Sequence, residues 1–210
     1  MVTAKGVHLL PANGEFVYDT IPWVGAQRGL SALKPFGPMN TFAGQAPTTD
    51  YTIALDQLQA EHPECATVSL VVAWFFDSED ASACNVHPST NFLLGQFDQV
   101  IGGVPVPSHW LCSSLTEQDY PGIIPLPGLP GTTNFVYGGT PSDPSLVRCL
   151  QDLKSRGFRV SFYPFLLGTA PGFPWRGRIT YANDVSDAAT AAVNSFLGSA
   201  SPGQFALRQT

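Results

Sequence analysis

The sequence predicts a mixed α/β domain, and three observations support that prediction. An apolar run at 68–76 is typical of a strand covered on both faces. A helical pattern with clear boundaries at 143–156 is followed by a β-branched and aromatic strand at 158–165. The chain has 210 residues, which is long enough for one substantial core. We therefore expect parallel strands joined by helices.

The N-terminal part is expected to form a hairpin followed by an extended arm. Segments 7–10 and 15–18 flank Pro-Ala-Asn-Gly, and Asn13-Gly14 is a strong turn signal. Residues 20–49 contain many Pro and Gly and show little periodicity, which is typical of an interaction arm. We assign residues 1–48 to this part.

A helix and the central strand are expected next. Thr49 or Asp50 can cap the helix, and Pro63 ends it. The buried strand at 68–76 follows, and residues 81–135 are predicted to be irregular because repeated prolines interrupt any long element. The apolar stripe of the helix comprises Tyr51, Ala54, Leu55 and Leu58.

A strand-helix-strand unit is predicted after residue 134. Its first strand is 135–137, Asp143 is placed as N-cap with Pro144 at the first helical position, and Gly157 closes the helix. In the second strand, 158–165, Pro164 indicates that the strand ends there or that this amide is not needed. The predicted apolar stripe of the helix comprises Leu146, Val147, Leu150 and Leu153.

A third helix is expected to begin after Ser186 or Asp187 and to end at Gly198. Its inner face would contain Ala189, Ala192, Val193 and Phe196. We assign residues 49–198 to one β/α domain and 199–210 to a tail. About three β/α units fit into this length, whereas a closed (β/α) barrel needs eight.

Composition excludes several classes of function. The formal net charge is −6 and no basic run occurs, so a nucleic-acid groove is not expected. The longest apolar run, Leu70 to Phe76, is too short to span a bilayer. The N-terminus lacks the apolar core of a secretory signal, so synthesis and assembly in a cytoplasm are expected. Only 12% of residues are charged, which fits a neutral monomer or a subunit buried in an assembly.

No metal or cofactor site is predicted. Neither a C-x-x-C pair nor a phosphate-loop spacing occurs, and Gly138-Gly139 is better explained by close backbone packing. The cysteines are interpreted as ordinary thiols, with Cys149 on or beside the buried helix face. The histidines are scattered and are interpreted as solvated or packing residues: His8, His62, His87 and His109.

Five motifs occur in an order that matches a known family. They are the opening segment Val7 to Pro11 with Gly14 to Tyr18, a first helix and strand at Ala54 to Ala60 and Val71 to Phe75, then Tyr137 to Asp143, Tyr163 to Phe165, and Pro174 to Thr180. Over roughly residues 7 to 198 the chain resembles the TIM-barrel-like region of the large tail-tip protein of gene transfer agents and tailed phages, often called the megatron protein. The resemblance implies a partial TIM-barrel-like domain with an N-terminal hairpin and long Pro/Gly-rich arms.

Three departures from the family pattern shape the functional expectation. Phe76-Asp77 replaces the usual Gly-Asp, the loop 166–173 is short, and the chain ends at Thr210 before the later strands that carry the family's acidic residues. The resemblance therefore implies a structural subunit of a tail tip or baseplate without its own catalysis. Its implied partners are hub, distal-tail and megatron-like proteins, its location is the virion after assembly in the host bacterial cytoplasm, and a homotrimer is expected.

Two groups of residues keep chemical alternatives open. Glycoside hydrolysis needs two carboxylates, for which Asp77, Glu79, Asp80 and Asp143 are candidates. A solvated acidic loop and a helix cap are the preferred explanation, because no second carboxylate at a strand end completes the pair. Trp175, Arg176 and Arg178 are candidate contacts, either with a neighbouring subunit or with a host-surface glycan. The alternatives to a scaffold are thus a cell-wall-degrading glycosidase and a glycan-binding module.

Overall fold

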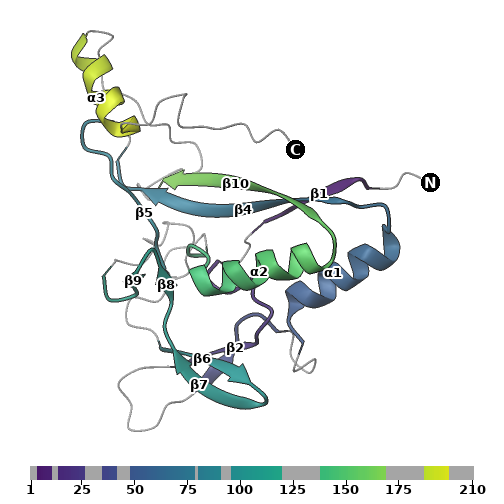
Figure 1. The fold of residues 1–210 in the computed structure, drawn as a ribbon. Coiled ribbons are helices and arrows are strands. Elements are labelled where there is room, and N and C mark those ends of the chain that lie inside the picture. The colour runs from purple at the N-terminus through teal and green to yellow at the C-terminus, as the bar shows by residue number, and fades with distance from the viewer. Residues whose placement is uncertain are drawn as a thin grey trace, which may run out of the picture. The chain divides into compact units, whose positions relative to one another are not determined.

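The computed structural model is a mixed α/β structure, as the sequence predicts, and no sheet in its described part closes into a barrel (Figure 1). The chain divides into two compact units, and each is described by itself. The first comprises residues 1–74 and 88–166; the second comprises residues 75–87 and 167–210. The structure describes residues 4–10, 14–26, 35–41, 48–78, 80–90, 96–119, 138–168 and 187–198.

One sheet has the order β1-β4-β10, with strands β1 (Gly6–Leu9), β4 (Thr67–Phe76) and β10 (Arg159–Gly168). All of it except the last two residues of β4 and of β10 belongs to the first unit. Strand β1 pairs in parallel with β4, in the register Val7↔Val68. The arrows of β4 and β10 point the same way in Figure 1. Strand β4 is buried on both faces, because Leu70 and Val71 are both inaccessible; the apolar run predicts this correctly.

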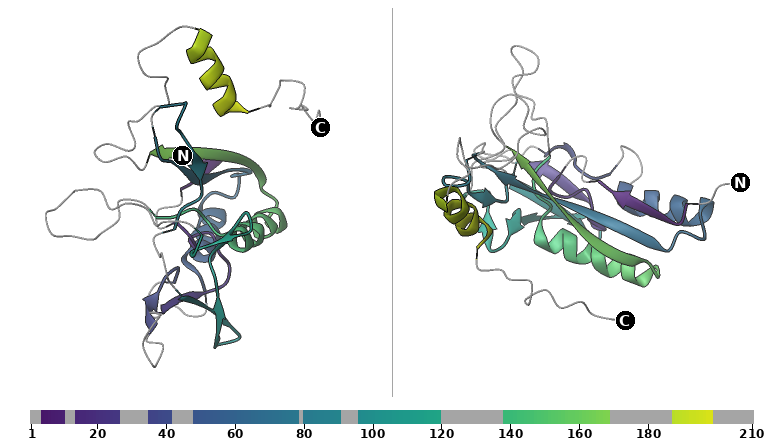
Figure 2. Two further views of the ribbon diagram at one scale, coloured as in Figure 1. Left: turned by 90° about the vertical axis from the view of Figure 1, so that its left-hand side faces the viewer. Right: turned by 90° about the horizontal axis from the view of Figure 1, so that it is seen from above.

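Helices α1 (Asp50–Glu61) and α2 (Asp143–Ser155) cover one face of this sheet, as Figures 1 and 2 show. Thr49 is the N-cap of α1 and accepts from the Thr52 amide, in agreement with the prediction. In α1, Tyr51 and Leu55 are buried, whereas Ala54 is exposed. The core between helices and sheet contains Tyr18, Tyr51, Leu55, Cys65, Val68, Leu70, Val72, Cys149, Leu153 and Phe158.

Two predicted details of α2 are wrong. The N-cap is Ser142, and Asp143 is the first helical residue, so Pro144 occupies the second helical position. The predicted apolar stripe is correct for Leu153, which is fully buried, and for Leu146, which packs against the core, but Val147 and Leu150 are exposed. Ser145 and Cys149 are buried in their place. The predicted C-terminal end of the helix is confirmed, since Gly157 has a left-handed φ of 85°. The predicted position of Cys149 on the buried face is confirmed as well, because its side chain is fully buried.

The predicted N-terminal hairpin is wrong. Strand β1 pairs with β4 and not with residues 15–18. Residues 14–18 form a turn, in which the Val17 amide donates to the Gly14 carbonyl. Gly14 has a φ of 76°, which favours glycine, and a Cβ there would collide with the Gly139 backbone. The expected close packing at Gly138-Gly139 is therefore confirmed, and it joins two segments far apart in the chain.

A second, antiparallel sheet has the order β3-β2-β6-β7. Its strands are β2 (Trp23–Ala26), β3 (Pro35–Pro38), β6 (Gln96–Ile101) and β7 (Val104–Ser108). A hairpin of β8 (Leu111–Cys112) and β9 (Leu115–Thr116) follows. The irregular structure expected at 20–49 and 81–135 is thus wrong where these strands lie, because pairing between distant segments stabilises strands that have no clear alternation.

A separate aromatic cluster packs on the second sheet. The rings of Phe16 and Trp23 are stacked with centroids 3.9 Å apart, and Phe97 meets Phe16 edge-on at 4.7 Å. Trp110 and Cys112 complete the buried cluster. Trp74 packs against this cluster and against the helix-sheet core, so the two cores share a side chain.

In the second unit, β5 (Val86–His87) pairs with the last residues of β4 in the register Phe75↔His87. Helix α3 (Asp187–Leu197) begins and ends where the sequence predicts, with Gly198 at a φ of 71°. Ala192 and Phe196 are half-buried and Val193 is exposed. The predicted strand 135–137 lies outside the described residues.

Candidate functional site

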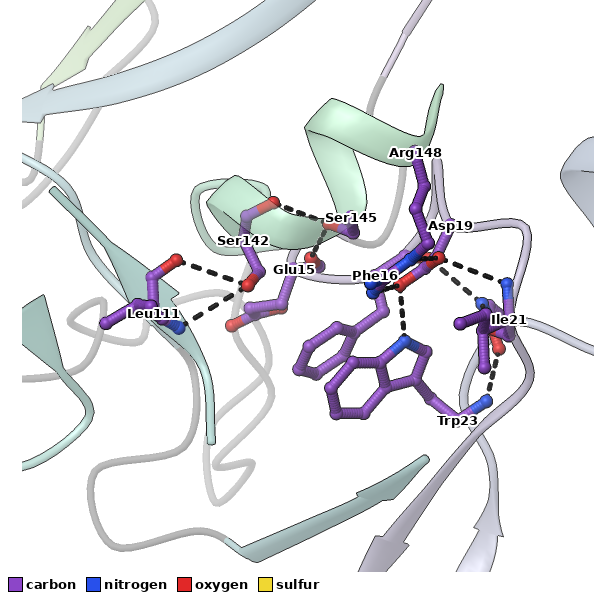
Figure 3. Close-up of polar contacts among 10 residues, drawn as sticks. Glu15, Phe16, Asp19, Ile21, Trp23, Leu111, Ser142, Ser145 and Arg148 are labelled. Carbon is purple, nitrogen blue, oxygen red and sulfur yellow. Dashed lines mark hydrogen bonds and ion pairs between the residues drawn. The ribbon is translucent and has the colours of Figure 1, made fainter. Parts of the chain in front are cut away.

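The most elaborate arrangement of polar side chains in the described part of the chain lies where the turn 14–19 meets the N-terminal end of α2 (Figure 3). We call it the polar centre and define it as Glu15, Asp19, Trp23, Asn40, Ser142, Ser145 and Arg148. The turn places its acidic residues inside the protein, where both Glu15 and Asp19 are fully buried.

Asp19 and Arg148 form the strongest contact of the polar centre. The Arg148 Nε and Nη2 atoms donate to the two carboxylate oxygens of Asp19, each at 2.7 Å. The Trp23 indole nitrogen donates to Oδ2 at 2.6 Å, and the Ile21 amide donates to Oδ1 at 3.1 Å. The carboxylate therefore has donors on both oxygens and is held as a charged, bidentate ion pair.

The N-cap residue of α2, Ser142, is bound by the turn and by β8. The Glu15 carbonyl accepts from the Ser142 amide at 2.9 Å and from the Ser145 hydroxyl at 3.3 Å. The Ser142 hydroxyl contacts both backbone polar groups of Leu111 in β8. Helix N-termini bind anions because their first amides lack partners inside the helix. At α2 the N-cap residue instead contacts the backbone of Leu111 in β8 through its hydroxyl, and the Ser145 hydroxyl of the first turn contacts the Glu15 carbonyl, as Figure 3 shows.

Asn40 fastens the turn to the second sheet. Its side-chain oxygen accepts from the Trp23 amide at 2.8 Å, and its amide nitrogen donates to the carbonyls of Phe16 and Ile21 at 3.1 and 3.0 Å. The side chain thus has three protein partners in a buried position. Buried amides bonded in this way are structural, since each bond offsets the cost of burying the group.

Two further buried carboxylates lie in the first unit. The Thr90 hydroxyl donates to Glu15 Oε1 at 2.9 Å, and Glu117 Oε1 lies 2.8 Å from His109 Nδ1. Glu117 is fully buried, whereas the His109 side chain is half exposed. The sequence analysis missed Glu15, Asp19 and Glu117 as site residues. The sequence contains one indirect indication of Glu15. The Gly138-Gly139 pair was expected to mark close packing, and in the structure the Glu15 side chain lies against Gly139.

A pocket of about 260 Å³ lies where β1 ends and α1 begins. Its two phenol hydroxyls are bonded to the backbone. The Tyr18 hydroxyl donates to the Leu9 carbonyl at 2.7 Å, and the Tyr51 hydroxyl donates to the Cys149 carbonyl at 3.3 Å. Burial raises the pKa of both phenols, so they stay neutral and are not acids or bases near neutral pH. The wall comprises His8, Leu9, Leu10, Val17, Tyr18, Met39, Asn40, Asp50, Tyr51, Ala54 and Leu55.

The carboxylates singled out from the sequence make local structural bonds. The Asn85 amide donates to Asp77 at 2.8 Å and is the main cause of a lowered pKa of that carboxyl. Asp80 accepts from the Ser82 hydroxyl and amide, which lower its pKa. Asp143 accepts from the Ser113 amide at 2.7 Å. These bonds are typical of turns and loop anchors.

Other predicted site residues are placed only in part. Trp175, Arg176, Arg178 and Glu79 lie outside the described residues, so the structure does not test them. His8 is exposed and its ring meets Tyr163 edge-on at 6.4 Å. All four cysteines are free thiols. In the described part of the chain, acidic, histidine and cysteine side chains form no group suited to a metal ion, and no helix is long and apolar enough to cross a membrane.

Comparison with known proteins does not identify the chain: no family model matches it, and no curated protein does.

Proposed function

We propose that this protein is a structural subunit of a phage or gene-transfer-agent tail tip that docks on neighbouring tail proteins and has no catalysis of its own. In this proposal the fold is a partial TIM-barrel-like domain, and its partners are hub, distal-tail and megatron-like subunits, with a homotrimer as the expected arrangement. It is assembled in the host cytoplasm and stays in the virion. The single observation that supports it most is the closed state of the polar centre.

The polar centre favours a scaffold over an enzyme because its groups bind one another. Asp19 has donors on both oxygens, and the Ser142 amide is taken by the Glu15 carbonyl. A glycosidase would need one carboxyl held as an acid beside a second held as a base or nucleophile, both facing the sugar. A buried ion pair instead joins the turn to α2 and stiffens the junction between the two sheets.

Exposed apolar side chains also support docking. Val104 in β7 is 61% exposed, Ile101 in β6 is 51% exposed, and Phe162 in β10 is 56% exposed. These side chains lie on sheets whose other residues include few charges, in a chain with only 12% charged residues. Ile101 and Val104 are cross-strand partners and so lie side by side, and neighbouring exposed apolar side chains favour contact with another protein. A subunit inside an assembly would bury them.

Deletion of the gene tests the proposal. Particles made without this chain are expected to lack a complete tail tip by electron microscopy and to lose infectivity or transfer activity. Complementation with the double variant Asp77→Asn, Asp80→Asn should restore both, because neither carboxylate is needed for catalysis. Normal particles from the deletion strain would overturn the proposal.

An enzyme assay separates the alternatives. The purified wild-type chain and the same double variant are applied to host peptidoglycan in a zymogram. No clearing is expected from either protein. Clearing by the wild-type chain that is lost in the variant would replace the scaffold proposal with the glycosidase.

A further inference from the structure

The pocket where β1 ends and α1 begins belongs to a β1-α1-β4 unit with parallel strands (Figure 1). The end of β1 contributes Leu9 and Leu10 to its wall, and the start of α1 contributes Tyr51 and Leu55. Its volume is about 260 Å³. An engineered cavity of about 150 Å³ in another protein holds one benzene ring, so this pocket has room for a fused two-ring molecule.

The wall of the pocket suits a neutral aromatic molecule. Among the described residues that line it, His8 and Asp50 can carry a charge, and both are exposed, so they border its open side. A charged molecule that entered further would lose its water without gaining a counter-charge. Tyr18, Tyr51 and Met39 also line the pocket, and phenol rings and thioethers pack favourably against another aromatic ring.

Asn40 has no donor to offer a ligand. Its side-chain nitrogen donates to the Phe16 and Ile21 carbonyls, which uses both of its N–H groups. Its backbone carbonyl accepts from the Asp50 amide at 3.0 Å. This residue therefore closes one side of the pocket as part of the fold, and a polar contact with a ligand has to be made elsewhere on the wall.

The Tyr18 hydroxyl provides that contact indirectly, because it lies between two carbonyls. It is 2.7 Å from the Leu9 carbonyl oxygen and 2.8 Å from the Val71 carbonyl oxygen, and the contact with Leu9 is only partly buried. A phenol has one proton and donates to one of these carbonyls at a time. When Tyr18 donates to Val71, the Leu9 carbonyl can accept from a ligand, and no buried polar group loses its partner.

We propose that the pocket binds a neutral, fused two-ring aromatic molecule with a single N–H or O–H donor, which bonds to the Leu9 carbonyl. The volume selects for two rings, the wall excludes charge, and the two positions open to the Tyr18 proton make room for the donor. The ligand replaces water that lies against an apolar wall, which favours binding. The inference goes beyond the proposed tail-tip role and does not depend on it, because all the residues that bind lie in one chain.

Two matched probes test the site in the full-length protein. Indole and indene have the same fused rings, but indene has a CH2 group where indole has its N–H. Each is titrated into the isotope-labelled protein and followed by NMR. Indole is expected to shift the amide signals of Leu9, Leu10 and Tyr51 with a Kd below about 1 mM. It should bind about fivefold more tightly than indene, the ratio that one neutral hydrogen bond supplies.

A pair of alanine positions on α1 tests the location. Ala54 and Ala60 are both exposed, and of the two Ala54 lines the pocket. Ala54→Phe places a ring at the pocket and is expected to weaken indole binding at least about tenfold, whereas Ala60→Phe should leave it unchanged. Both substitutions are on the helix surface, so far-UV circular dichroism is expected to show a folded protein in each case.

Tyr18→Phe tests the donor. This variant removes the internal donor to the Leu9 carbonyl, so the preference for indole over indene is expected to exceed that of the wild type. An unchanged or smaller preference would overturn the assignment of the Leu9 carbonyl.

Three results with the other proteins would overturn the proposal. They are the absence of saturable shifts up to about 10 mM indole, equal binding of indole and indene, and full indole binding by Ala54→Phe. Failure of the tail-tip proposal is distinguishable, because it would appear as normal particles without this chain, whereas the titrations contain no other tail protein.

Discussion

The first unit contains two sheets that reach stability in different ways. The parallel sheet has a continuous apolar strand, β4, with two helices packed on one face and Leu70 and Leu153 fully buried between them. The antiparallel sheet has short strands that contain Pro105 and Pro107, and its core is a cluster of aromatic rings. The strands and helices of the parallel sheet are thus visible as apolar patterns in the sequence, whereas the strands of the antiparallel sheet form without such patterns.

The difference arises from where each sheet obtains its partners. Helices α1 and α2 are adjacent in sequence to β4 and β10, so local patterns and short connections bring their faces together. Strand β2 pairs with β6, which lies far along the chain, and Phe16 and Phe97 meet on Trp23. In the antiparallel sheet, ring stacking and backbone pairing between distant segments provide the stability. Its strands therefore lack the alternation of apolar and polar residues from which a strand is predicted.

Two of the contacts that join the regions involve large or charged buried side chains. Trp74 packs on both cores, and the Asp19–Arg148 ion pair links the turn before β2 to helix α2. Asp19 also accepts from the Trp23 indole, which belongs to the aromatic core. The sheets are therefore expected to unfold together, although their cores differ.

The largest expected effect is the loss of an aromatic ring from the antiparallel region. Phe97→Ala should lower the free energy of unfolding by about 4 kcal/mol, because it leaves a cavity beside Phe16 and Trp23. Leu153→Ala should lower it by about 3 kcal/mol in the parallel region. Urea unfolding followed by far-UV circular dichroism and tryptophan fluorescence measures both.

Val147→Ala is the matched control for this comparison. Val147 is half exposed on α2, so its variant should stay within about 0.5 kcal/mol of the wild type. Coincident transitions by both probes are expected in all three variants. If Phe97→Ala produced an early fluorescence transition while the helical signal persisted, the two sheets would be separate folding units.

A similar loss is expected when the link between the regions is cut. Arg148→Met should cost about 3 kcal/mol, because it leaves the fully buried Asp19 without its counter-charge. The double variant Asp19→Asn, Arg148→Met should recover part of that loss, since no unpaired charge stays buried. Urea unfolding at neutral pH is the measurement. A cost below about 1 kcal/mol for Arg148→Met would show that the ion pair does not hold the regions together.

The smallest effect for a single step, about 1.4 kcal/mol for one thiol and one pH unit, is a dependence on alkaline pH that involves one thiol in each core. Burial raises the pKa of Cys149 in the helix-sheet core and of Cys112 in the aromatic core to about 12. An unfolded thiol titrates near 8.5, so between about pH 9 and 12 the unfolded chain binds fewer protons and stability falls as pH rises. The stabilisation is fully present below about pH 8.5.

Each buried thiol should then cost up to about 1.4 kcal/mol for each pH unit in this window. Urea midpoints at pH 8, 9 and 10 measure the slope, and Cys149→Ala and Cys112→Ala should each flatten it. Above about pH 10 the raised pKa of Tyr18 and Tyr51 adds to the loss, because unfolded phenols ionise there. A slope that neither alanine variant changes would show that these thiols are not shielded in the native state.

The sequence by itself determined the elements whose signals are local. The Thr49 cap, the Gly157 and Gly198 helix ends and the apolar strand β4 all follow from neighbouring residues, and each is present. Pro105 and Pro107 led to the wrong prediction that β7 would be irregular. A proline whose nitrogen faces the free edge of a sheet does not interrupt pairing on the other side of the strand.

Tertiary structure alone decided the second sheet and the polar centre. Nothing near Asp19 in sequence indicates Arg148, and nothing near Asp98 indicates that Val24 and Pro107 flank it. The physical reason is that these contacts depend on register and packing between segments far apart in the chain. Capping and apolar periodicity depend on residues within one or two turns, and they can be read without the fold.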